Sequence, residues 1–352
     1  MLGESSTETP HLPWLHAPLR AALATQRAHA ILVYGPEGVG QFEFASMLAQ
    51  SWLCETTDRN PAEAFALPAC GVCASCRLVR ARSHPDLLVL VPDALREALG
   101  WGEPESAATE KAGKAKPSKE IRIDALRGAI QFAQSTASRR RAKVVVIHPA
   151  DRMNAVAANG LLKTLEEPPG IARFVLATGD PQALPPTVRS RCQAVHLGVP
   201  ETALALHWLE AQGVAHAAVL LAASGGQPLL ALEGAREGVD AALWARIPEL
   251  MQRGDAAAFT GWPLPRLIDA LQKLCHDAMC VACGAAPRYF APDLVPAQTG
   301  VDALTAWGKS LRDLARRAEH PWNAGLIGEA LVQQAQQALS SKRPSLRYTS
   351  AP

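Results

Sequence analysis

The sequence predicts an α/β domain built on a parallel sheet, followed by an all-helical region. Three observations carry this prediction. Five short apolar runs alternate with helical stretches in the first 199 residues, the first run leads into a glycine-rich turn and a helix, and no strand pattern remains after Pro200. Strands that alternate with helices are typical of a parallel sheet with both faces covered.

The expected strands are short apolar runs, as is typical of parallel strands buried on both faces. They cover residues 29–34, 86–91, 144–147, 173–178 and 193–197. The spacing of apolar residues between these runs is helical, most clearly over 154–167, where Pro168 and Pro169 end the pattern.

The chain of 352 residues is long enough for two or three domains. We expect an α/β core domain over residues 1–199, a small helical domain over 200–238, a larger helical domain over 239–345 and a tail over 346–352. Within the core domain, residues 102–118 are rich in Ala, Gly, Glu, Lys and Pro, and we expect a mobile insertion there.

Bulk composition argues against several classes of protein. The formal net charge of +2 is too small for nucleic-acid binding by bulk charge, so such a role would need local patches. No apolar run approaches the roughly 20 residues of a membrane helix, and Met1 to Pro10 lacks the basic-then-apolar order of a signal peptide. We therefore expect a cytoplasmic protein with no membrane partner, whose eight cysteines are thiols or metal ligands rather than disulfides.

The glycine-rich turn after the first expected strand has the frame of a phosphate-binding loop. In the working motif G-x-x-x-x-G-K-[ST], backbone N–H groups hold phosphate oxygens, the lysine supplies a cation and the hydroxyl binds magnesium. Gly35, Gly38 and Gly40 keep the turn, but Gln41 and Phe42 replace the lysine and the hydroxyl residue. We therefore expect no bound ATP. The turn either packs between strand and helix without a ligand or retains residual nucleotide binding.

The end of the third expected strand gives an independent test of hydrolysis. Two acids are needed there to hold magnesium and polarise water. The strand is instead followed by His148, Pro149 and Ala150, and Asp151 lies three residues past its end. Both halves of the hydrolysis machinery are therefore missing.

A dense cysteine run follows the first core helix. Cys70, Cys73 and Cys76 form a C-x-x-C-x-x-C pattern, and Cys54 lies upstream. Each two-residue spacer forms a turn that brings thiolates toward a common centre, and a structural zinc takes four such ligands. The sequence predicts a structural Zn²⁺ site in a module over residues 54–76, with Cys54 as the fourth ligand. Iron–sulfur binding would need a redox context that is missing, and free or buried thiols are the other alternative.

Three further cysteines, Cys275, Cys280 and Cys283, lie near His276 and suggest a second metal site. Their spacing is helical rather than that of a zinc knuckle, and cysteine is commonly buried as a small apolar residue. We expect core thiols here.

Arg191 lies in the segment TVRSRC between the fourth and fifth expected strands. An arginine on such a loop can reach the nucleotide of a neighbouring subunit, where its planar fork would neutralise charge on a transferring phosphoryl group. Exposed arginines are common, so this segment alone does not establish that role.

Taken together and in order, several segments resemble one known family. They are YGPEGVG, the four-cysteine insert, NGLLKTLEEPP (159–169), LATGDP (176–181) and SRC (190–192). They resemble the delta-prime subunits of the bacterial DNA polymerase III clamp loader, which belong to the AAA+ class. The resemblance covers roughly Trp14 to Leu232 with specific motifs, and the remainder matches by helical character and position.

The resemblance implies an AAA+ P-loop-type core domain with a zinc-binding insert, then a helical lid and an all-α collar. It implies a component of a DNA-directed DNA polymerase (nucleotidyltransferase) holoenzyme with no activity of its own. The implied partners are gamma/tau and delta subunits in a hetero-pentameric ring, the beta sliding clamp, and primed DNA through the assembled complex. Arg191 is implied to be an arginine finger that acts in trans on the ATP of a neighbouring gamma/tau subunit, and Thr178 a remnant of a nucleotide sensor.

Three functions compete. The leading one is an assembly subunit that completes the ring and helps to place the clamp. The second is an active clamp-loader ATPase with an atypical loop, although gamma/tau subunits keep the lysine and the acidic strand end that this sequence lacks. The third is a zinc-dependent DNA-binding module. Two arginine groups suit contacts with DNA or a partner, although solvated faces are the favoured interpretation: Arg77, Arg80 and Arg82, and Arg139, Arg140 and Arg141.

Overall fold

The computed structural model describes residues 12–25, 28–56, 67–101, 117–297, 299–317 and 323–341. The chain divides into two compact units, Met1–Leu204 and Ala205–Pro352. The insertion expected at 102–118 lies outside the described residues except for its last two positions, and the tail expected at 346–352 lies outside them entirely.

A five-stranded parallel sheet forms the centre of the first unit, with the strand order β2-β3-β4-β1-β5. The strands are β1 (Ala30–Tyr34), β2 (Leu87–Leu90), β3 (Lys143–Ile147), β4 (Ala172–Thr178) and β5 (Gln193–His196). Each strand end lies within one residue of the range expected from the sequence. The prediction of a parallel α/β sheet is confirmed.

Burial along each strand follows its place in the sheet. The interior strand β3 is buried at every position, whereas the edge strand β5 is buried only at Val195. An interior parallel strand has helices on both faces and therefore reads as a continuous apolar run.

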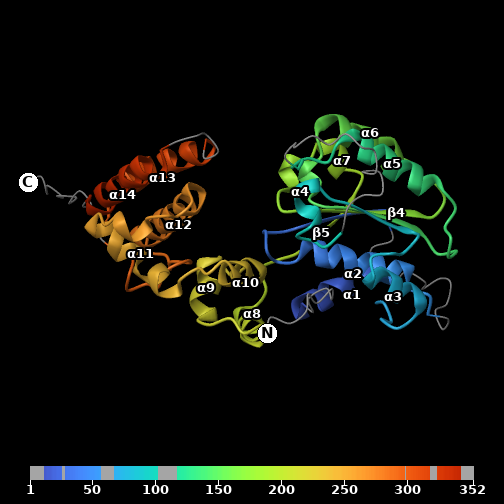
Figure 1. Ribbon diagram of the computed structural model, residues 1–352, viewed down its shortest axis with the longest axis horizontal. Coiled ribbons are helices and arrows are strands. Elements are labelled where there is room, and N and C mark those ends of the chain that lie inside the picture. Colours follow the sequence, from blue (N-terminus) through green and yellow to red (C-terminus); the bar gives the residue numbers. More distant parts are fainter. Residues whose placement is uncertain are drawn as a thin grey trace, which may run out of the picture. The chain divides into compact units, whose positions relative to one another are not determined.

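Helices cover both faces of this sheet (Figure 1). On one face lie α5 (Ile123–Gln134), α6 (Ala155–Glu166) and α7 (Pro186–Arg189), and on the other lie α1 (His16–Thr25), α2 (Gln41–Leu53) and α3 (Ala74–Arg80). Leu126 of α5 and Leu161 of α6 share one buried cluster with Phe174 of β4. The shorter elements are η1 (Pro13–Leu15), α4 (Asp93–Arg96), η4 (Ala150–Arg152) and η5 (Pro181–Ala183).

Helix α6 carries most of the segment NGLLKTLEEPP. The side-chain oxygen of Asn154 accepts a hydrogen bond from the N–H of Ala157 at 2.9 Å and so caps the start of the helix. Pro168 follows its end and cannot continue it. Leu161 and Leu165 are buried, as expected, whereas Glu166 is exposed in the last turn.

The described part of the second unit is helical. Residues of both the expected lid and the expected collar belong to it, and α8 (Thr202–Ala211) crosses the division between the units. Its other elements are α9 (Ala217–Ala223), α10 (Pro228–Arg236), α11 (Ala241–Arg253), η6 (Ala257–Phe259), α12 (Leu264–Ala282), α13 (Val301–Ala315) and α14 (Ala324–Ser340).

A fully buried carboxylate organises the segment between α12 and α13. Asp277 accepts hydrogen bonds from the backbone N–H groups of Arg288 at 2.9 Å, Tyr289 at 2.7 Å and Phe290 at 2.9 Å. These bonds hold the helix-free segment between α12 and α13 against α12.

Among the residues described, no single helix combines the length and the apolar composition needed to cross a membrane. Helices α9 and α10 meet both criteria only as a pair, which is bent by 113°.

Candidate metal centre and phosphate loop

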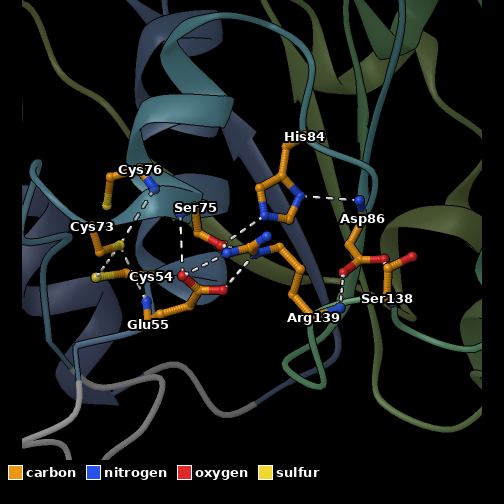
Figure 2. Close-up of polar contacts among 9 residues, drawn as sticks. All are labelled: Cys54, Glu55, Cys73, Ser75, Cys76, His84, Asp86, Ser138 and Arg139. Carbon is orange, nitrogen blue, oxygen red and sulfur yellow. Dashed lines mark hydrogen bonds and ion pairs between the residues drawn. The ribbon is translucent and has the colours of Figure 1, made fainter.

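Four cysteine side chains converge at the end of α2, and Figure 2 shows three of them, Cys54, Cys73 and Cys76. Their sulfur atoms all lie within 4.8 Å of one another. The sulfurs of Cys70 and Cys76 are 3.9 Å apart, as are those of Cys54 and Cys73. Four sulfurs arranged tetrahedrally around zinc at about 2.3 Å are separated by about 3.8 Å. The donor set therefore fits one metal ion.

Backbone N–H groups surround these sulfurs. The N–H of Cys70 donates to Cys54 Sγ at 3.3 Å, and the N–H groups of Glu55 and Cys76 each donate to Cys73 Sγ at 3.4 Å. Hydrogen bonds of this kind favour the thiolate, which is the form that binds metal.

The thiols of Cys54, Cys70 and Cys76 differ in acidity. Hydrogen bonds from the Thr56 hydroxyl and from the backbone N–H groups of Val72 and Cys73 lower the pKa of Cys70 to about 5. Burial raises the pKa of Cys54, but hydrogen bonds from the Cys70 N–H and from Thr56 outweigh it, so that pKa lies below its usual range. Burial raises the pKa of Cys76. A divalent cation would have to displace the proton of Cys76.

Residues beside the cysteines connect the cluster to a loop that precedes β3 (Figure 2). Glu55 follows Cys54 and forms a two-point ion pair with Arg139, whose Nε and Nη2 lie 2.5 and 3.1 Å from the two carboxylate oxygens. Arg139 Nε also donates to Ser75 Oγ at 3.2 Å, and Ser75 precedes Cys76. This ion pair lowers the pKa of Glu55.

Asp86 completes the connection to the sheet. Its carboxylate is fully buried and accepts hydrogen bonds from the N–H groups of Ser138 at 2.7 Å and Arg139 at 2.8 Å. Lys143, the first residue of β3, places Nζ 3.0 Å from the same carboxylate. Burial alone would raise the pKa of Asp86, but these donors hold it below its usual value.

His84 lies within this network and not among the sulfurs. Its Nδ1 accepts the backbone N–H of Asp86 at 3.0 Å, so the ring proton is on Nε2, which donates to Ser75 Oγ at 2.9 Å. Burial lowers the pKa of His84 and favours this neutral form. A ring that donates to Ser75 cannot take its proton, so this pair does not form an activated serine nucleophile.

Sequence reasoning missed Glu55, Asp86 and Lys143. The available signal was a charged residue next to a predicted ligand, and a charged residue at the start of each of two apolar runs. Neither signal identifies a partner, because Glu55 and Arg139 are 84 positions apart.

At the other end of α2, two glycines of the phosphate loop are required by packing. A Cβ on Gly35 would lie 2.1 Å from the carbonyl oxygen of Leu197. Gly40 has a φ of +100°, and its Cβ would lie 2.7 Å from a methyl group of Leu12. Gly38 also adopts a positive φ, of 73°. Close packing alone therefore accounts for Gly35 and Gly40.

Gln41 is 6% exposed, and its amide is directed into the loop. Its Nε2 donates to the carbonyl oxygens of Gly35 and Pro36, both at 2.6 Å. Both amide hydrogens are therefore used by the loop backbone.

The position of the missing hydroxyl residue is taken by an aromatic contact. The rings of Phe42 and His148 lie 5.1 Å apart, and burial lowers the pKa of His148 to about 4, so the imidazole is neutral at pH 7. The carboxylate of Asp151 accepts the hydroxyl proton of Thr178, whose Oγ1 accepts the N–H of Asp180 at 3.1 Å. The acid nearest the strand end is thus engaged with Thr178.

Arg191 lies between α7 and β5, and its side chain is 30% exposed. Its Nε donates to Glu166 Oε1 at 2.6 Å, its Nη2 donates to the same oxygen, and its Nη1 donates to the carbonyl oxygen of Thr187 at 2.8 Å. No pattern in the sequence indicates the contact with Glu166.

At least four of the six arginines considered for DNA or partner contacts have contacts within the chain, Arg141 among them. Arg80 donates to the carbonyl of Gly71 at 2.7 Å, Arg82 donates to the carbonyl of Gly100, and Arg139 pairs with Glu55. For Arg77 and Arg140, the favoured interpretation as part of a solvated face stays a prediction.

The later cysteines do not converge as the first four do. Cys275 is buried and donates to the carbonyl of Leu304 at 3.3 Å, which fits a core thiol. Cys280 is half-buried, and the core-thiol prediction is wrong for Cys283, which is exposed just past the end of α12. In the described part of the chain, the first four cysteines are the one group with metal-site geometry.

Comparison with known proteins gives the family. The family model described as "DNA polymerase III, delta subunit" matches residues 15–201, more than half of the chain. The DNA polymerase III subunit delta' of Pseudomonas aeruginosa is 36% identical over 256 residues, covering 69% of each chain. The subunit delta' of Escherichia coli K12 is 30% identical over 74% of this chain and 76% of its own. The subunit tau of E. coli K12 is 32% identical over 52% of this chain and 23% of its own. The chain belongs to the family of DNA polymerase III delta-prime subunits.

Proposed function

We propose that this chain is a non-hydrolysing clamp-loader subunit of DNA polymerase III. It completes a hetero-pentameric ring with gamma/tau and delta subunits and helps to load the beta sliding clamp onto primed DNA. Family membership supports the clamp-loader role, and the similarity to a tau subunit supports the choice of ring partners.

The observation that carries the non-hydrolysing role is the phosphate loop bound by its own side chain. Gln41 donates to the loop carbonyls and brings no cation, while Phe42 and a neutral His148 stand where magnesium ligands would be needed. A loop without a lysine and a magnesium ligand lacks the groups that stabilise phosphoryl transfer.

In the absence of its own hydrolysis, the chain contributes to catalysis through Arg191. In this proposal it is the arginine finger that acts in trans on ATP held by the neighbouring gamma/tau subunit. Partial exposure of its guanidinium supports this role.

The test is a clamp loader reconstituted with Arg191→Ala. We expect normal assembly and a loss of clamp- and DNA-stimulated ATP hydrolysis at the affected site, where a finger is worth about 10³ to 10⁵ in rate. Arg127→Ala is the matched control, because Arg127 is exposed on α5 and pairs only locally with Asp124. Unchanged ATPase and clamp loading with Arg191→Ala would refute the finger.

The competing function is an active ATPase with an atypical loop. The similarity to a tau subunit favours this function. It predicts ATP binding by the isolated chain that is lost on further substitution at Gln41. Our proposal predicts no such binding.

We also propose that the four cysteines hold one structural Zn²⁺. The sulfur geometry and the backbone N–H donors support this assignment. Metal analysis of protein purified under reducing conditions should give about one zinc per chain. Salt-dependent DNA binding by the isolated chain that chelation abolishes would instead favour a zinc-dependent DNA-binding module.

A further inference from the structure

The last turn of α6 lies against the loop that carries Arg191. Glu166 is the final residue of α6, and its carboxylate oxygen accepts hydrogen bonds from both Nε and Nη2 of Arg191. The carbonyl of Thr187 in α7 accepts a further bond from Nη1 at 2.8 Å. The guanidinium is therefore held from two elements.

Both elements are fixed in the core of the first unit. Leu161 and Leu165 of α6 and Val188 of α7 are at most 1% exposed and belong to one buried cluster. The position of Glu166 and of the Thr187 carbonyl is thus set by the packed helices and not by the loop that carries Arg191.

The remaining donors of Arg191 are suited to an external anion. A guanidinium has five N–H donors, one on Nε and two on each terminal nitrogen. The contacts with Glu166 and Thr187 use one donor on each nitrogen. Within the described residues, one N–H remains on Nη1 and one on Nη2, and terminal guanidinium N–H groups of this kind bind phosphate.

We propose that Glu166 is the positioning residue of Arg191: it fixes the plane of the guanidinium so that the two remaining donors meet the phosphoryl group of the neighbouring subunit's ATP. The inference rests on the proposed arginine finger. Glu166 itself contacts no substrate and acts only through Arg191.

The exposure of the pair argues against a role in stability. The side chains of Arg191 and Glu166 are 30% and 48% exposed, and ion pairs at that exposure contribute little to folding. Removal of Glu166 should therefore leave the thermal unfolding midpoint of the chain unchanged while it alters the orientation of Arg191.

The experiment compares reconstituted clamp loaders that carry Glu166→Ala, Glu166→Gln, Glu167→Ala, Arg191→Ala or the double variant Glu166→Ala with Arg191→Ala. The neighbouring Glu167 is the matched control, because it is exposed and forms no ion pair among the described residues. The readouts are kcat and KM for stimulated ATP hydrolysis.

We expect Glu166→Ala to lower kcat about 10-fold with KM for ATP unchanged, because misplacement of a catalytic group by about 1 Å can cost up to about 10²-fold. Glu166→Gln keeps an acceptor of the same length and should restore most of kcat. Glu167→Ala should behave as wild type. In the Arg191→Ala background, removal of Glu166 should have no further effect, because the two residues act as one unit.

The outcomes separate the two proposals. If Arg191→Ala leaves hydrolysis unchanged, the finger itself is refuted. If Arg191→Ala abolishes stimulation but Glu166→Ala matches Glu167→Ala, the finger stands and the positioning role is overturned. An equal loss from Glu166→Ala with and without Arg191 would also overturn it, because Glu166 would then act by another route.

Discussion

A phosphate-binding loop lies at one end of helix α2 and a cysteine cluster lies at the other. The two differ in whether their polar groups are left free to bind a ligand. At the N-terminal end, the amide of Gln41 is bound to the carbonyls of Gly35 and Pro36. At the C-terminal end, Cys54 joins three other sulfurs that face one another and accept backbone hydrogen bonds. The phosphate loop is bound by its own side chain, whereas the cysteine cluster offers four sulfur donors to an ion.

The difference between the loop and the cluster shows why the residue pattern of a motif alone is weak evidence of function. The glycines of the phosphate loop are explained by contacts with Leu197 and Leu12, whether or not a phosphate ever binds. The cysteines have no such packing explanation, because Cys70 is exposed and Cys73 is only half-buried. Ligand binding is better judged from the groups that the local structure leaves unused.

The largest expected effect is at the cysteine end of α2. Cys76→Ser should abolish metal binding and lower the free energy of unfolding by on the order of 5 kcal/mol, because the binding energy of a structural zinc, about 10–16 kcal/mol, contributes to folding. Metal content and thermal unfolding measure both effects. Cys283→Ser, at an exposed site, should leave both unchanged. Retention of one metal per chain in Cys76→Ser would contradict the proposed four-cysteine site, and with it the difference between the phosphate loop and the cysteine cluster.

The next effect tests whether the metal module depends on its connection to the sheet. Asp86→Asn leaves Lys143 without its buried partner and should lower the free energy of unfolding by about 3–5 kcal/mol. Metal content should stay at one per chain, because Asp86 contacts no sulfur. Asp124→Asn, at a side chain that is 84% exposed, is the control for urea unfolding. Loss of metal in Asp86→Asn would show that the cluster is not a self-contained site.

A smaller effect tests the phosphate-loop end by its pH dependence. The pKa of His148 is about 4 in the folded chain, against about 6.5 when unfolded. Below pH 6.5 the unfolded chain binds a proton that the folded chain does not, so stability is full above that pH and falls as the pH approaches 4. At pH 5 the loss should be about 2 kcal/mol. Urea unfolding of wild type and His148→Gln at pH 7 and pH 5 measures it, and equal losses in both proteins would contradict the assignment.

The smallest expected effect follows from Gln41→Lys, which restores the lysine of the phosphate-binding motif. Gln41→Lys removes two hydrogen bonds to the loop carbonyls and should cost about 1 kcal/mol. The isolated variant should still hydrolyse no ATP, because Phe42 and His148 continue to occupy the magnesium side of the loop. ATP turnover by Gln41→Lys above background would show that the loop lacks only its cation.

Much of the first unit could be predicted from the sequence, because its signals are local. Strands β1, β3 and β4 are mostly apolar, and so their ends were placed within one residue. The clustering of the four cysteines could also be predicted, because two-residue spacers between cysteines constrain the backbone over a few positions.

The remaining features depend on pairs that are distant in sequence. Glu55 and Arg139 are 84 positions apart and Glu166 and Arg191 are 25 apart, and no periodicity relates either pair. The hydrogen bonds from Gln41 to its own loop could not be predicted either, because the absence of the lysine does not show where the side chain that replaces it is directed. Cys283 was misjudged because helical spacing from Cys275 does not reveal that α12 ends just before it.

The position of the four clustered cysteines along the chain has a consequence for synthesis. All four precede β3, so a nascent chain that has emerged from the ribosome as far as Cys76 already carries the complete donor set. Arg139 and Lys143 emerge later and find Glu55 and Asp86 already present. If the four cysteines hold the proposed zinc, its loading can come before completion of the sheet, and the order of translation matches an order of assembly from local to distant contacts.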